Sequence, residues 1–334
     1  MRVGISKFVR TKTFTLTLLL VVVIVFFQFA SRGFSYLSVL NIRNILDSMV
    51  IYILFAIAEG LLIISGEIDL SPGYIGVFSG MAMGLMLASG VPWYIAVTVS
   101  LLAGTAFGLL NAFLINALGM QGFIATLATG AYVAKGFAQV ISDGKSVNIS
   151  DPVIVWIGTG KVFDIPVALI ISLVAIIIFG IVLAKTKFGR SIYLCGGNRM
   201  AAKFAGLNPK RLSYILFAIS GTLGALAGIV FAGRMLAANL FSTANYAFPA
   251  ITAVILGGIS FGGGSGGMLG CFLGLLILSS FNNGLTVVGV TPYWQQVFSG
   301  ALLLLALTFD YFSIKNKMRI KPVKNSKETK RAET

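Results

Sequence analysis

Long apolar runs, separated by short polar or glycine-rich interruptions, recur along almost the whole chain. A helix that crosses a bilayer needs roughly 20 mostly apolar residues, so 334 residues can hold about ten such helices with short connections. The pattern therefore predicts an all-α integral membrane protein with about ten transmembrane helices, some of them broken or re-entrant. The expected spans are residues 14–30, 49–65, 73–89, 92–117, 122–141, 165–184, 212–233, 247–260, 268–288 and 293–313.

Composition and charge agree with a membrane protein. The chain is 57% hydrophobic and 10% charged, and its mean hydropathy is +0.95, whereas soluble domains are about a quarter charged. The formal net charge of +15 would suggest nucleic-acid binding in a soluble protein. Here membrane topology explains the charge better, and no nucleic acid is expected as a partner.

Basic residues concentrate in three segments that fall on one side of a ten-span arrangement. Residues 1–13 contain four, residues 185–211 contain seven and no acid, and residues 314–334 contain eight. The positive-inside rule places such segments in the cytoplasm. We therefore expect a cytoplasmic amino terminus (1–13), a polytopic domain (14–313) and a cytoplasmic tail (314–334) beside anionic membrane lipid.

The first span has a second interpretation, as a cleaved signal peptide behind a basic segment. Its apolar core is long, and Phe29–Gly33 lacks a good small-x-small cleavage site. A retained helix is the preferred interpretation.

The most polar interruption is Ser65–Tyr74, in which Glu67, Asp69 and the pair Pro72-Gly73 separate two apolar runs. Charges at membrane depth are costly, and irregular backbone there must be buried in protein or reach water. Residues 257–264 align without a gap on residues 66–73, with three identities and one Leu/Phe match. Matching breaks in two hydrophobic segments are typical of transporters. The chain is therefore predicted to be a transporter.

Polar side chains inside the spans are candidates for lining or gating a path. A lone carboxylate against lipid costs several kcal/mol, while neutral amides and hydroxyls suit an uncharged, hydroxylated solute. Alternatively, such groups only hydrogen-bond across helices. Lys135 is expected to snorkel toward the outer end of its span. The candidates are Glu59, Glu67, Asp69, Asn111, Thr126, Asn282 and Asn283, with Asn116 and Thr129 of similar character.

Several chemistries are absent from the sequence. The chain has no histidine, which excludes imidazole metal sites, proton relays and Ser/His or Cys/His nucleophiles. Its two cysteines, Cys195 and Cys271, fall in different environments, so a disulfide is not expected. No G-x-x-x-x-G-K-[ST] loop is present, and Gly262, Gly264 and Gly267 fit G-x-G-x-x-G only between spans. We expect no catalytic residue, metal or cofactor, and any ATP must bind a separate subunit.

The connection 185–211 is the second informative element. Gly196-Gly197-Asn198 is expected to break it, with Gly197 supplying backbone angles that favour glycine. Residues 199–205 are predicted to form a short helix that carries Met200 and Phe204 on one face, and Gly206 should end it. Such a helix could dock in a groove on a partner, and a basic loop on lipid headgroups is the alternative.

A set of motifs is spread over nearly the whole chain. They are Gly66–Ser71, Phe123–Leu127, Phe188–Asn198 with Ala201-Ala202 and Ala205–Leu207, Val254–Ser260, and Asn282–Leu285. In sequence and in order, these motifs resemble those of permease subunits of bacterial ABC importers for ribose, xylose, arabinose and galactose.

The resemblance implies a permease of the bacterial inner membrane without its own ATPase site. It implies a second permease copy or a paralogue, cytoplasmic ATP-binding subunits, and an extracytoplasmic protein that delivers the sugar. It also implies that the connection 185–211 docks the ATPase. The residues to which that role carries over are Gly189, Arg190, Gly196, Gly197, Asn198, Ala201, Ala202 and Gly206.

Three departures from the family pattern do not disturb the resemblance, and alternative functions stay open beside it. Glu67 stands where the family often has Gly, Pro72 where it often has an aliphatic residue, and no acid lies near Arg199. An ion-coupled secondary transporter would also use broken helices and buried carboxylates. Within the importer class, the solute could be a nucleoside or a sugar-derived signal. A membrane-embedded enzyme is the third class considered, although no nucleophile–base pair supports it.

Overall fold

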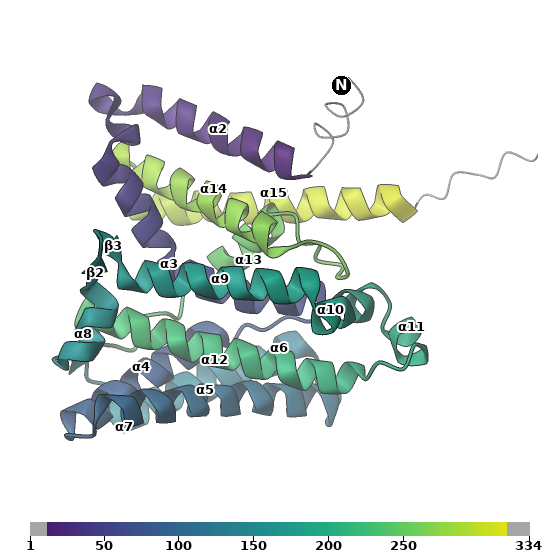
Figure 1. Ribbon diagram of the computed structural model, residues 1–334, viewed down its shortest axis with the longest axis horizontal. Helices are drawn as coiled ribbons and strands as arrows, with labels where there is room; N and C mark the ends of the chain where they lie inside the picture. The colour runs from purple at the N-terminus through teal and green to yellow at the C-terminus, as the bar shows by residue number, and fades with distance from the viewer. Residues whose placement is uncertain (1–11, 319–334) are drawn as a thin grey trace, which may run out of the picture.

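The computed structural model describes residues 12–318, which form an almost wholly helical body (Figure 1). Most of the predicted terminal segments 1–13 and 314–334 lies outside the described residues. Each predicted span is a helix. The helices are α2 (Lys12–Ala30), α3 (Val39–Ile64), α4 (Pro72–Ala88), α5 (Trp93–Asn116), the run α6, η2 and α7 (Gly122–Leu127, Ala128–Ala134, Lys135–Ser142), α9 (Val167–Lys185), α12 (Pro209–Met235), α13 (Ala247–Leu256), α14 (Met268–Val287) and α15 (Pro292–Met318).

Within the described residues, seven helical segments are long and apolar enough to cross a membrane. Two others are shorter: α4 has 17 residues and α13 has 10. Ten residues of helix rise about 15 Å, which is half of a hydrocarbon core. Helix α13 is therefore too short to cross the core alone, and both short helices adjoin interruptions that the sequence predicted. We call residues 65–71, before α4, the first break and residues 257–267, after α13, the second break.

Shorter elements connect the long helices. They are η1 (Arg32–Leu37), α8 (Pro152–Thr159), α10 (Lys187–Gly197), α11 (Arg199–Phe204), β1 (Val147–Asn148), β2 (Lys161–Val162), β3 (Ile165–Pro166) and β4 (Ala237–Ala238). Strands β1 and β4 pair antiparallel, with Val147 opposite Ala238, and β2 and β3 form a hairpin. Helix α3 begins ten residues before its predicted span because the Ser38 side chain caps it by accepting from Asn41 N.

Helices α3 and α12 form the centre of the body. Nearly all of α3 from Met49 to Ile64 is buried. Glycines let α12 approach α4 and α5 closely: a Cβ on Gly80 would lie 3.0 Å from Gly228 O, and a Cβ on Gly104 would lie 2.7 Å from Gly221 O. Close backbone approach through small residues is how helices associate in membranes.

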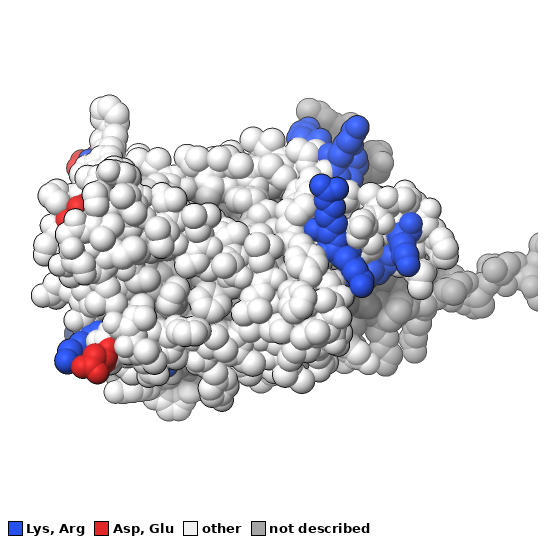
Figure 2. Space-filling model, turned by 90° about the horizontal axis from the view of Figure 1, so that it is seen from below, with Lys and Arg blue, Asp and Glu red and all other residues white. Residues whose placement is uncertain are grey.

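The basic segments meet at one end of the body. The start of α2, the end of α15 and the pair α10–α11 all lie at the right in Figure 1. In Figure 2, lysine and arginine side chains gather at that end, and the visible aspartate and glutamate side chains lie at the other. We call the first the basic end and the second the opposite end, which carries α8 and the β2–β3 hairpin.

Candidate functional site

Both helix breaks touch α10 at the basic end. The N–H of Gly264 donates to Ile64 O at 2.8 Å, which joins the second break to the end of α3. A Cβ on Gly196 would collide with Ile64 O and lie 2.7 Å from Gly264 N. A Cβ on Gly263 would lie 2.8 Å from Gly196 O and 3.2 Å from Gly66 Cα. Backbone therefore packs on backbone here. We call Gly66, Gly196, Gly263 and Gly264 the glycine junction.

The connection 185–211 is more helical than the sequence predicted. Helix α10 occupies residues that were expected to be a loop, and it is capped by Thr186. The short helix is confirmed as α11: the Asn198 side chain accepts from Met200 N and Ala201 N, and Gly206, at φ +81°, follows its end.

The expectation for Gly197 is wrong. This residue ends α10 with no positive φ, and a Cβ added to it would meet nothing within 4 Å. The steric constraint falls on Gly196 instead, because the two breaks lie against it. A glycine pair in sequence does not reveal which member faces a neighbour.

The other residues of the connection 185–211 that the resemblance assigns to ATPase docking differ in exposure. Gly189 is buried, and a Cβ there would collide with the carbonyl of Leu183 at the end of α9. Ala202 is buried, whereas Arg190 and Ala201 are exposed. Three large apolar side chains are also exposed on α10 and α11. They are Leu194, Met200 and Phe204, at 55%, 63% and 85%; we call them the apolar face.

Glu67 connects the first break to α11. Its Oε1 lies 3.2 Å from Nη2 of Arg199, and the same nitrogen donates to Asn116 Oδ1 at 3.2 Å. Asn116 in turn donates to Ser213 Oγ at 2.7 Å, which reaches the start of α12. Burial raises the pKa of Glu67, while the Arg199 guanidinium opposes that rise. The Glu67 departure therefore adds an ion pair between break and connection.

Asp69 organises the turn into α4. Its Oδ1 accepts from the backbone N–H of Ser71 at 2.8 Å and from the Ser71 hydroxyl at 2.5 Å. Its Oδ2 accepts from Ser220 Oγ of α12 at 2.8 Å. The carboxylate is fully buried and accepts backbone and hydroxyl donors at the start of the next helix, as the sequence predicted.

Further nominated residues join this cluster from α5 and the α6–η2 run. Asn111 Nδ2 donates to Ser71 Oγ at 2.8 Å, and the Thr129 hydroxyl donates to Asn111 Oδ1. Thr126 Oγ1 accepts from Leu70 N at 3.0 Å. All are buried, and their hydrogen bonds tie the start of α4 to α5 and the α6–η2 run. We call Asp69, Ser71, Asn111, Thr126, Thr129 and Ser220 the Asp69 network.

The remaining nominated residues do not gather in one place. Glu59 is fully buried on α3. Among the described residues, neither of its carboxylate oxygens has a hydrogen-bond partner. Asn282 accepts from Ser299 Oγ at 3.3 Å, and Asn283 Oδ1 is buried without a described partner. These asparagines lie on α14, outside the Asp69 network.

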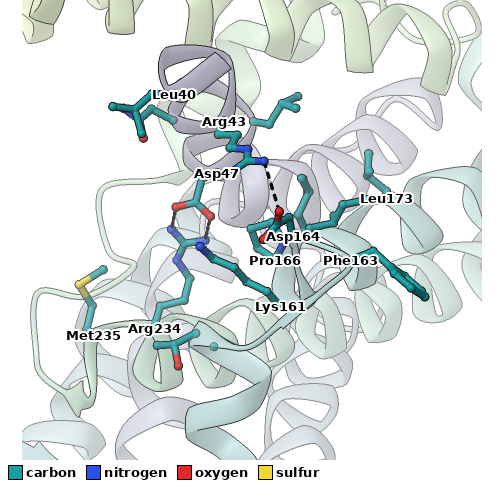
Figure 3. Close-up of a pocket in the computed structure, with 16 residues that line it drawn as sticks. Leu40, Arg43, Asp47, Lys161, Phe163, Asp164, Pro166, Leu173, Arg234 and Met235 are labelled. Carbon is teal, nitrogen blue, oxygen red and sulfur yellow. Dashed lines mark hydrogen bonds and ion pairs between the residues drawn. The ribbon is translucent and has the colours of Figure 1, made fainter. Parts of the chain in front are cut away.

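A cavity of about 590 Å³ opens at the opposite end (Figure 3). Arg234 of α12 holds Asp47 of α3 through two bonds of 2.9 and 2.5 Å. A longer ion pair of 3.7 Å joins Arg43 to Asp164 across the same cavity. We call this the outer pocket. Phe163, 96% exposed, lies on the β2–β3 turn at its edge.

Sequence analysis did not identify the Asp47–Arg234 pair. The partners are 187 positions apart, so no local pattern joins them. The available signal was Arg234 itself, the basic residue in the last turn of α12, after a long run without charged residues.

Comparisons with known proteins agree with the resemblance. A family model described as "Branched-chain amino acid transport system / permease component" matches residues 41–307. The ribose import permease protein RbsC of Bacillus subtilis is 35% identical over 83% of this chain and 86% of its own length. The D-allose transport system permease protein AlsC of Escherichia coli K12 is 35% identical over 82% of this chain and 84% of its own length. The L-arabinose transport system permease protein AraH of the same strain is 33% identical over 77% of this chain and 78% of its own length. No solved structure matches the chain.

Proposed function

The chain belongs to the family of ABC-importer permeases, and on this premise we propose that it forms the membrane path for a sugar. A binding protein would deliver the sugar, and a separate ATPase would drive transport. The observation that carries the proposal is the glycine junction, in which both helix breaks lie against α10 of the coupling connection. Contact of this kind lets a displacement of α10–α11 reach both breaks.

The proposed orientation puts the basic end in the cytoplasm. Its support is that α10–α11, the start of α2 and the end of α15 share one end, as the positive-inside rule requires. Both termini are then cytoplasmic, and the outer pocket opens on the extracytoplasmic side of the membrane.

The ATPase is proposed to dock on α10 and α11. The apolar face of Leu194, Met200 and Phe204 is exposed beside basic residues. An apolar helix face that inserts into a partner groove is a common recognition mode. Arg199 keeps α11 in register by pairing with Glu67.

The opposite end is the proposed contact for the sugar-binding protein. The outer pocket presents Arg43, Lys161 and Asp164 near its mouth, and such polar rims are typical of protein interfaces. A second copy or a paralogous permease would complete the path. Ribose, allose and arabinose appear in the names of the relatives, so an aldose is the proposed solute class. The same relatives do not favour an ion-coupled carrier.

Reconstitution tests the proposal. The chain, its ATPase subunit and its sugar-binding protein are placed in proteoliposomes, and uptake of labelled ribose, allose and arabinose is measured. We expect uptake of at least one sugar that requires ATP and stops when the ATPase subunit is omitted. Uptake that persists without ATP, follows an imposed pH gradient and disappears in Asp69→Asn or Glu59→Gln would contradict it.

A further inference from the structure

Residues 239–246 form an irregular stretch that runs deep into the body. The stretch follows β4 at the opposite end and ends where α13 begins. Thr243 Oγ1 donates to Gly73 O at 2.7 Å, in the first turn of α4. From Gly73 to the far end of α4 the helix rises about 22 Å. Thr243 therefore lies more than halfway across a hydrocarbon core of about 30 Å.

This stretch exposes both a polar and an aromatic side chain within two residues of Thr243. Phe241 is 75% exposed, and the Asn245 amide is exposed without a hydrogen bond to any described residue. Irregular backbone is not found against lipid tails, since its polar groups would stay unpaired there. A free amide in hydrocarbon would add a further desolvation cost. Protein or water must cover this surface.

The α6–η2–α7 run borders the same surface and adds a cation. Lys135 Nζ lies 5.1 Å from the centre of the Phe241 ring, and Lys135 forms no ion pair with a described carboxylate. Tyr132, one turn earlier, is 76% exposed. Together these groups offer hydrogen-bond donors, an acceptor and ring faces. Sparse polar groups among aromatic rings are the usual lining of small-molecule sites.

We propose that Tyr132, Lys135, Phe241 and Asn245, here called the loop face, line the water-filled sugar path. The inference rests on the proposed function and assigns the path to residues that the sequence analysis did not nominate. Two of the residues that the sequence suggested for the path, Asn111 and Thr126, are instead buried in the Asp69 network. A second permease copy would close the far side of the path. The amide and ammonium would then meet sugar hydroxyls, and the rings would meet its C–H faces.

Thiol labelling of variants that each carry one introduced cysteine beside the two native ones tests the inference in the assembled importer. Both native cysteines are buried, so the unmodified chain sets the background. The test variants are Phe241→Cys and Asn245→Cys. The controls are Val22→Cys on α2 and Ile178→Cys on α9, whose side chains are also exposed, at 55% and 51%. The probe is a small, charged methanethiosulfonate applied to sealed membrane vesicles.

We expect both test variants to react at least roughly tenfold faster than the controls, because the reactive thiolate forms in water and not in hydrocarbon. Labelling at the control rate would overturn the inference. So would a spontaneous disulfide between two copies at Asn245→Cys without reagent access, since it would indicate a dry contact. Sugar uptake by the unmodified chain is measured in the same vesicles. ATP-dependent uptake without labelling would refute only the assignment of the loop face to the path. Labelling without ATP-dependent uptake would refute only the proposed function.

Discussion

The two ends of the molecule are held together by different kinds of contact. At the basic end, the glycine junction brings three backbone segments against one another with no side chains between them. At the opposite end, α3 and α12 are joined across the outer pocket by the side chains of Asp47 and Arg234. A backbone contact through glycine tolerates no added atom, whereas the part-buried Asp47–Arg234 pair can open by rotation of its side chains.

This difference assigns separate tasks to the two ends. We infer that α10, the two breaks and the end of α3 move as one unit when an ATPase moves α10–α11. The outer pocket can instead change its width as side chains separate. An importer needs both properties, since it must transmit force on one side and admit a solute on the other.

The largest expected effect is at the junction. Gly196→Val places side-chain atoms against Ile64 O and Gly264 N, and overpacking of this kind costs about 1–3 kcal/mol. We expect a lower thermal unfolding midpoint and loss of uptake. The controls are Gly196→Ala, which adds only the clashing Cβ, and Gly197→Ala, whose added Cβ meets nothing within 4 Å. If the variants at positions 196 and 197 lost equal stability and uptake, close backbone packing at Gly196 would not be what holds the basic end together.

The next effect is at Asp69. Asp69→Ala leaves the Ser71 and Ser220 donors without their acceptor, at about 1–3 kcal/mol for buried groups. Asp69→Asn keeps one oxygen and should lose less stability and only part of the uptake. Asp143→Ala, at an exposed ion pair, is the control. Denaturant unfolding in detergent measures all three, and an Asn variant as damaged as the Ala variant would argue against a capping role.

A smaller effect is expected at the outer pocket. A double-mutant cycle with Asp47→Asn and Arg234→Gln should give a coupling of about 1 kcal/mol that weakens with salt. The exposed pair Lys145–Asp143 provides a reference cycle with smaller coupling, because its side chains are 77% and 85% exposed. If the coupling energy of Asp47 and Arg234 equalled the loss of stability in Gly196→Val, the opposite end would not open more easily than the basic end.

The smallest effect concerns pH. The folded pKa of Glu67 is raised by burial, so the folded state holds this proton more tightly than the unfolded state. Stability should therefore fall slightly as pH rises from the ordinary carboxyl range through the raised folded pKa. Glu67→Gln should remove that slope while leaving the low-pH stability nearly unchanged. An unaltered slope in Glu67→Gln would assign the pH dependence to another group.

Local patterns predicted the helices but not the contacts between distant segments. Ten apolar runs became ten helices because length and hydropathy are local properties. Helix α10 was missed because no helix was assigned to the residues before Gly196, although the expected break at Gly196–Asn198 does separate α10 from α11. The Asp69 turn was predicted, since its partner Ser71 is two residues away. Ser220 and Arg234 were not, because their partners lie 151 and 187 positions away.

The central claim is that the coupling connection and the two breaks form one unit. Its most direct test is a pair of distances between spin labels in the assembled importer, measured with and without ATP. One pair joins Phe204→Cys on α11 to Phe261→Cys in the second break, both exposed positions. The other joins Phe204→Cys to Phe163→Cys at the outer pocket. We predict that ATP leaves the first distance unchanged and shifts the second. A first distance that changes with ATP would show that α11 moves independently of the breaks and would contradict the claim.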